Sequence, residues 1–215
     1  MLGAISGLLL FTELSRQLGT VLLALFCFGI LWTGDYRLIA RLLGLVVALM
    51  GGLFIYVARY ADYAIVDLLY ASVWPDYTAG SSLLIIGLIG TTIVPYNLFL
   101  ASGISKGQSI REMRLGLIVA IVIGGIISVA ILLAGTQVTG EFSFAALAAT
   151  LSDRVGGWGV IFFGVGLFSA GMSSSITSPL AAAVTAQSIL GRGEVDWSSK
   201  GRNFRLVWGS ILAIG

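Results

Sequence analysis

The residues best suited to chemistry lie near the middle of an apolar run that extends from 79 to 104. They combine a helix breaker, flexible backbone and side-chain oxygens: Gly90, Thr91, Thr92, Pro95, Tyr96 and Asn97. Proline removes one helical hydrogen bond and clashes with the preceding turn. In hydrocarbon, the freed carbonyls are stable only where they face protein or a wet cavity. We therefore predict a helix broken at about 91–96 by Gly90 and Pro95, with a substrate site at the break. The alternative is a simple proline kink repaired by threonine hydroxyls.

A second polar cluster lies between 169 and 183, where five serines and one threonine are mixed with glycine, alanine and Pro179. Small residues let helices approach closely, and their hydroxyls bond across or along helices. We favour this packing role over direct contact with a substrate. Met172 is available as a soft ligand, although a single methionine among serines is more typical of a gap filler.

Several kinds of chemistry have no residues to support them. The chain has no histidine, and its single cysteine, Cys27, lies in an apolar run. No nucleophile with a partner base and no carboxylate pair is present, so we predict no catalytic residues, no cofactor and no enzyme activity. A net charge of +2 gives no reason to expect a nucleic acid partner. No charged residue lies near the middle of an apolar run, so a dication bound there would need most of its anionic ligands from outside these 215 residues.

The elements that must position these residues are transmembrane helices. The chain is 58% hydrophobic and 10% charged, whereas soluble domains are about 25% charged. A helix needs about 20 apolar residues to cross the hydrocarbon. We predict one all-α, polytopic transmembrane domain over 1–215, with spans at about 18–33, 38–58, 79–104, 115–135 and 158–190. Shorter apolar stretches at 1–12 and 206–215 predict partial helices, so we expect the chain to be a fragment.

The basic residues predict the orientation of the chain. Nine of the twelve lysines and arginines lie in or beside the loops 34–37, 105–114 and 191–205, and the alternating loops carry only Arg16, Arg59 and Arg154. Short loops rich in lysine and arginine remain in the cytoplasm. We therefore predict that these three basic loops are cytoplasmic and that the protein lies in the cell membrane.

Residues 90–102 read Gly-Thr-Thr-Ile-Val-Pro-Tyr-Asn-Leu-Phe-Leu-Ala-Ser. This segment resembles the sixth helix of the natural resistance-associated macrophage protein (Nramp) family, Gly-Ala-Thr-Val-Met-Pro-His-Asn-Leu-Tyr-Leu-His-Ser. Residues 166–177 resemble the eighth helix of that family, and residues 34–39 resemble the loop before its fifth helix. The likeness covers about helices 4 to 8 and the start of helix 9.

The resemblance implies a partial LeuT-type inverted-repeat fold and transport of divalent metal cations, linked to protons in the parent protein. It also implies metal contact by the backbone carbonyl of Thr91. The family's Asp-Pro-Gly-Asn motif is absent from this chain. The family's methionine ligand is replaced by Val94, and its histidine by Tyr96. Valine offers no ligand and a thioether favours softer metals, so we expect a harder or partly hydrated ion such as Mg²⁺.

Two other functions are compatible with the same residues. A LeuT-type carrier could use the broken helix to hydrogen-bond a small organic solute. A membrane assembly subunit would not transport anything, and would tolerate changes at Thr91 and Pro95. For the 215 residues alone we expect no transport, because inverted repeats need both halves.

Overall fold

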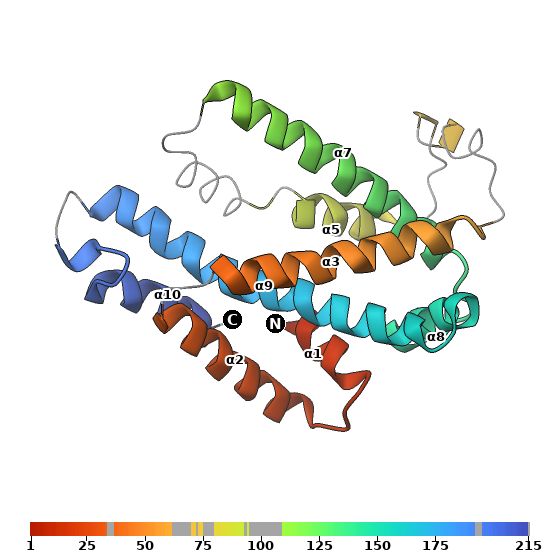
Figure 1. Cartoon of the computed structure of the whole chain (residues 1–215), viewed down its shortest axis with the longest axis horizontal. Coiled ribbons are helices and arrows are strands. Elements are labelled where there is room, and N and C mark those ends of the chain that lie inside the picture. Colours follow the sequence, from red (N-terminus) through yellow and green to blue (C-terminus); the bar gives the residue numbers. More distant parts are fainter. Residues whose placement is uncertain are drawn as a thin grey trace.

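The computed structural model describes residues 1–33, 37–61, 70–71, 73–74, 80–92, 94, 109–191 and 195–214. Of these residues, only the backbone is described at 37–40, 42–43, 92 and 195. The described residues form helices and no strands (Figure 1). The predicted all-α class is therefore confirmed. The helices are α1 (Leu2–Leu9), α2 (Arg16–Thr33), α3 (Arg37–Ala58), α5 (Ser82–Thr92), α7 (Ile110–Gly135), α8 (Phe144–Val155), α9 (Trp158–Leu190), the 3-10 turn η1 (Val195–Trp197) and α10 (Arg202–Ile214).

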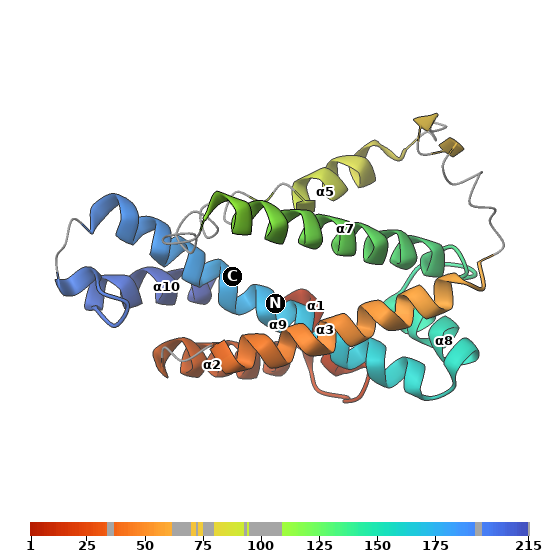
Figure 2. The ribbon, with the colours of Figure 1, turned by 45° about the horizontal axis from the view of Figure 1, so that its top comes forward.

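Helix α9 is the central element of the bundle. Its 33 residues give a rod of about 50 Å, which is longer than the roughly 30 Å thickness of the hydrocarbon. Helices α1, α2, α3, α8 and α10 all contact it, and α7 packs on α3 (Figure 2). The helix continues through Pro179, so proline alone does not break a helix that neighbours support on several sides.

Two buried clusters meet along α9. One joins α1, α2, α9 and α10 and includes Leu23, Cys27, Met172 and Trp208. The other joins α3, α7, α8 and α9 around Phe54 and Phe163, whose rings meet edge to face with their centroids 5.9 Å apart. Because α9 contributes to both clusters, it couples the two halves of the bundle.

Within the described part of the chain, three helices are long and apolar enough to cross a membrane: α2, α7 and α9. Shorter apolar helical segments lie at Gly44–Ala58 in α3 and Ser82–Thr91 in α5. These helices fall within or close to the five spans expected from the sequence. For the expected span 79–104, the structure describes only the helix that ends at Thr92, and most of the remainder lies outside the described residues. The assignment of five crossings therefore remains a prediction.

The structure adds one helix that the sequence did not predict. Helix α8 covers Phe144–Val155, where the Ser143 hydroxyl accepts a hydrogen bond from the backbone N–H of Ala146 (3.0 Å). Its inner face buries Leu147, Ala148 and Leu151 against neighbouring helices. At 12 residues it is too short to span the bilayer, which is why a search for crossing segments missed it.

Aromatic rings and arginines gather where α3 ends. The hydroxyls of Tyr56 and Tyr60 are 3.1 Å apart, Arg59 lies over the Tyr56 ring, and Arg154 from α8 lies over the Tyr60 ring. The hydrogen bond with Tyr56 raises the pKa of the Tyr60 phenol. Tyrosines with snorkelling cations are typical of the membrane interface.

Candidate substrate site

Helix α5 ends inside the segment predicted to carry the site. Gly90 and Thr91 are helical, the helix stops at Thr92, and Val94 is no longer helical. The Thr91 hydroxyl donates to the carbonyl of Leu88 (2.9 Å), so its lone pairs remain available as acceptors. In a continuing helix, the Thr91 carbonyl would accept from residue 95. Residue 95 is proline and has no N–H, so the Thr91 carbonyl has no helical partner.

The structure does not place the other predicted site residues. Pro95, Tyr96 and Asn97 lie outside the described residues, as does the side chain of Thr92. The side chains of α5 from Ser82 to Thr91 are exposed, and Val94 is half-buried. The grouping of Thr91, Thr92, Val94, Tyr96 and Asn97 as one substrate site therefore remains a prediction.

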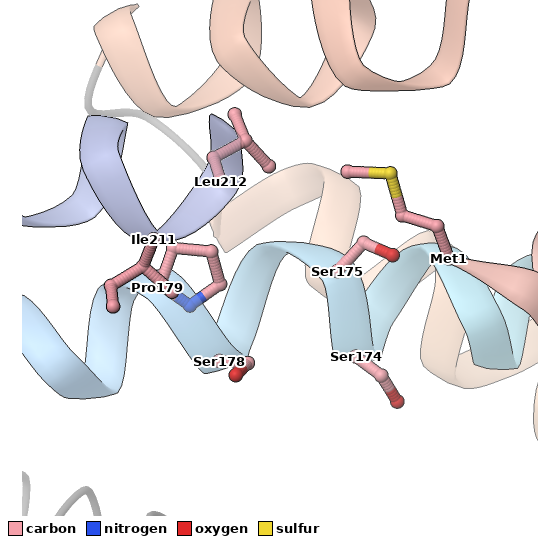
Figure 3. A pocket seen from close by; sticks show the side chains of 7 residues that line it. All are labelled: Met1, Ser174, Ser175, Ser178, Pro179, Ile211 and Leu212. Carbon is pink, nitrogen blue, oxygen red and sulfur yellow. The ribbon is translucent and has the colours of Figure 1, made fainter. Parts of the chain in front are cut away.

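The polar stretch of α9 does form part of a described cavity. The cavity has a volume of about 260 Å³. It is lined by residues of α9, α10 and the N-terminus (Figure 3): Met1, Ser174, Ser175, Ser178, Pro179, Ile211 and Leu212. The Ser175 hydroxyl lies on the same side of α9 as the Met1 thioether, while Ser174 and Ser178 point away from it (Figure 3). None of the side chains that the structure describes around the cavity is charged.

Several hydroxyls of α9 already donate within their own helix. Ser175 donates to the carbonyl of Gly171 (2.8 Å), Ser174 to that of Ala170 (3.1 Å) and Thr177 to that of Ser173 (2.9 Å). Their remaining capacity is to accept, which suits water, a cation or a donor group of a solute. Pro179 also deprives the Ser175 carbonyl of its helical partner, as Pro95 does for Thr91. The sequence carried this signal in its Ser-x-x-x-Pro spacing, but it did not reveal that α10 closes the cavity.

The small residues of this stretch serve the packing role that the sequence favoured. Gly7 of α1 approaches α9 so closely that an added Cβ would lie 2.5 Å from the Gly164 carbonyl oxygen. At Gly171, an added Cβ would collide with the backbone of Ala4. Met172 is 1% exposed, with its sulfur 3.7 Å from the Cys27 thiol. It fills the core between α2 and α9, as expected.

Among the residues that the structure describes, no three His, Cys, Asp or Glu side chains lie close enough to hold a metal ion. The donors that the described helices offer are hydroxyl and carbonyl oxygens, together with thioethers. These groups can accept bonds from a passing solute or its hydration shell, but they do not neutralise a dication.

This helical bundle, whose described residues include three helices able to cross a bilayer and a polar stretch inside the central helix, is an integral membrane protein. Comparison with known proteins gives its family. The family model "Natural resistance-associated macrophage protein-like" (Nramp) matches residues 1–215, and the chain belongs to that family. The resemblance read from residues 90–102 and 166–177 is thereby confirmed.

Curated relatives match at low identity. The chain is 27% identical to the divalent metal cation transporter MntH of Erwinia tasmaniensis over 164 residues, which cover 66% of this chain and 40% of the relative. It is 28% identical to MntH of Vibrio campbellii over 144 residues, which cover 60% of this chain and 33% of the relative. It is 26% identical to MntH of Verminephrobacter eiseniae over 205 residues, which cover 86% of this chain and 47% of the relative. The chain thus spans less than half the length of these relatives, and no solved structure matches it.

Proposed function

We propose that this chain provides part of the substrate pathway of a secondary transporter that carries a divalent metal cation across the cell membrane. The observation that carries the proposal is the end of α5 at Thr92, three residues before a proline that leaves the Thr91 carbonyl without a helical partner. Family membership and the similarity to the divalent metal cation transporters MntH support the class of substrate. The activity is transport rather than catalysis.

In this proposal the cation meets the Thr91 carbonyl, and Thr92, Tyr96 and Asn97 contribute oxygens to the ion or to its water. Anionic ligands come from parts of the complete protein outside these residues, because a dication cannot shed its water to neutral oxygens alone. Val94 supplies no ligand. We therefore infer a preference for a harder or partly hydrated ion such as Mg²⁺ over Mn²⁺.

The first test measures ion flux in liposomes that contain the complete gene product. A Pro95→Ala variant regains an N–H for the Thr91 carbonyl, and we expect its flux to fall at least about tenfold, which corresponds to about 1.4 kcal/mol at the transport barrier. Gly87→Ala is the matched control, because a methyl group there meets open space on the same helix. Equal flux in Pro95→Ala and the parent would refute a role for the broken helix.

The second test examines the identity of the ion. Competition between Mn²⁺ and Mg²⁺ should favour Mg²⁺ in the parent protein. Val94→Met adds a thioether, and the preference should move toward Mn²⁺ and Cd²⁺. Strong Mn²⁺ selectivity in the parent without competition by Mg²⁺ would exclude the hard-ion proposal. Flux of a small organic solute with no dependence on metal would favour the alternative carrier.

Proton linkage and orientation form the last parts of the proposal. A pH-sensitive dye trapped in the liposomes should report acidification in step with metal uptake. Absence of this acidification would exclude proton coupling.

We place loops 34–37, 105–114 and 191–205 on the cytoplasmic side because of their basic residues. Impermeant thiol reagents applied to single cysteines placed in these loops should react only after the membrane is opened.

A further inference from the structure

A groove of about 660 Å³ lies between the last turns of α2 and the first turns of α10. The first turns of α10 lie at the opposite end of the bundle from α8 (Figure 1). Helices α2 and α10 contact each other there, and both belong to the cluster around Trp208. Gln187 of α9 donates from Nε2 to the carbonyl of Trp197 (2.6 Å), which ties the turn before α10 to the central helix. The walls of the groove are therefore formed by α2, α10 and the turn before α10.

The floor of the groove is aromatic. Phe28 and Trp32 stack with their ring centroids 5.5 Å apart, and Trp208 meets Phe28 at 5.2 Å. Trp208 is 1% exposed, whereas Phe28, Trp32 and Leu206 remain 42%, 50% and 63% exposed. Because α2 is long and apolar enough to span the membrane, this apolar floor continues into the exposed apolar face of a transmembrane helix.

The outer rim of the groove is cationic. Lys200, Arg202 and Arg205 line it, and none of the lining residues that the structure describes is acidic. Arg205 lies 4.2 Å from the centre of the Trp32 ring, which holds its guanidinium at the level where α2 ends. Among the described residues, no carboxylate pairs with any of these three cations. The groove thus has a positively charged rim above an apolar slot, which is the space over its aromatic floor.

We propose that this groove binds one anionic glycerophospholipid of the cytoplasmic leaflet. The phosphate sits among Lys200, Arg202 and Arg205, and an acyl chain lies along Phe28, Trp32 and Leu206. The order of groups along α10, with cations in the first turn and apolar or small residues after them, matches the order of groups in a lipid. This site does not depend on which ion the protein carries.

The charge and depth of the groove favour a lipid over other occupants. An acidic peptide would pair with the cations of the rim, but its polar backbone would not cover the exposed aromatic floor. A free phosphate would use the rim and not the slot. Basic residues at the cytoplasmic end of a transmembrane helix are attracted to anionic lipid headgroups, and tryptophan prefers the same depth.

The rim is tested by native mass spectrometry of the complete gene product, released from nanodiscs that hold equal parts phosphatidylglycerol and phosphatidylcholine. The parent should retain phosphatidylglycerol preferentially. K200Q/R202Q should lower that preference by roughly tenfold or more, because each basic residue near an anionic surface contributes about fivefold in affinity. Both residues are exposed, and Arg205 stays in place on Trp32, so the fold is preserved. R111Q/R114Q, which removes two exposed cations from α7, is the matched control.

The slot is tested independently by Gly209→Leu. Gly209 lines the groove, and an added side chain meets open space there, so leucine fills the slot while it also improves helix propensity. We expect lipid retention to fall severalfold. Gly124→Leu on α7, where space is also open, should leave retention unchanged.

Loss of the preference in K200Q/R202Q together with weaker retention in Gly209→Leu would support the proposal. An unchanged preference in K200Q/R202Q would overturn it, as would an equal loss in R111Q/R114Q, which would indicate diffuse charge attraction. Full retention in Gly209→Leu would also overturn it. Displacement of the lipid by soluble glycerol phosphate at equal concentration would assign the rim to a soluble phosphate instead.

Discussion

Helices α1 and α5 are both short, apolar and rich in glycine, yet their surroundings are opposite. In α1, Ala4 and Ile5 are 1% and 3% exposed, because Gly7 and Gly171 let its backbone touch that of α9. In α5, Leu83 is 81% exposed, and Gly87 and Gly90 face open space. Lipid is as apolar as leucine, so hydrophobicity does not drive helices together in a membrane. The comparison shows that matched small residues on two helices decide which ones pack.

The largest effect is expected where α1 meets α9. Gly171→Leu places a side chain in the backbone of Ala4, which a packed junction cannot accommodate. We expect little or no folded protein, as measured by yield after detergent extraction and by size-exclusion profile. Gly87→Leu on α5 is the matched control and should accumulate normally. Normal accumulation of Gly171→Leu would show that α1 does not pack on α9 as described.

The next effect concerns large buried side chains. Phe163 is 3% exposed in the core between α3 and α9, and Phe163→Ala should cost about 3–5 kcal/mol. A corresponding fall in the thermal unfolding temperature in detergent would measure it. Leu83→Ala on α5 should change the unfolding temperature little. If Leu83→Ala were as costly, α5 would be packed in the complete protein, and the comparison of the two helices would fail.

A smaller effect is expected at the sulfur pair between α2 and α9. Cys27 is 0% exposed, with its thiol 3.7 Å from the Met172 sulfur. Cys27→Ala should cost about 1 to 1.5 kcal/mol, comparable to other deletions of a single buried heavy atom. In the folded protein, the peptide that contains Cys27 should resist N-ethylmaleimide and react only after unfolding in SDS. Rapid labelling in the native state would place α2 away from α9.

The smallest effect is expected at the start of α7. The Ser109 hydroxyl accepts from the Glu112 backbone N–H (3.3 Å), and the Glu112 carboxylate accepts from the Ser109 backbone N–H (2.9 Å). Ser109→Ala removes this cap and should cost about 1 kcal/mol locally. Hydrogen exchange should rise in the first turn of α7 and stay unchanged in α8, which has its own cap at Ser143. Unchanged exchange in α7 would mean that other contacts hold this turn.

Some features of the candidate site follow from the sequence, and others depend on the tertiary structure. Pro95 has no N–H in any conformation, so the missing partner of the Thr91 carbonyl follows from the sequence alone. The cavity beside Pro179 does not, because Ile211 and Leu212 reach it from α10. The sequence also gave no sign of α8, whose burial depends on contacts with α3, α7 and α9.

Composition and spacing by themselves determined that this chain is helical, that it belongs in a bilayer and that Pro95 has no N–H to offer the Thr91 carbonyl. Those properties depend on hydropathy and on covalent structure, which are local. Only the tertiary structure decided that α9 stays continuous through Pro179, that α1 lies against it at Gly171, and that Trp32 and Arg205 meet above an apolar groove. Such contacts join residues far apart in the chain, and no local pattern specifies which small or aromatic residues will face each other.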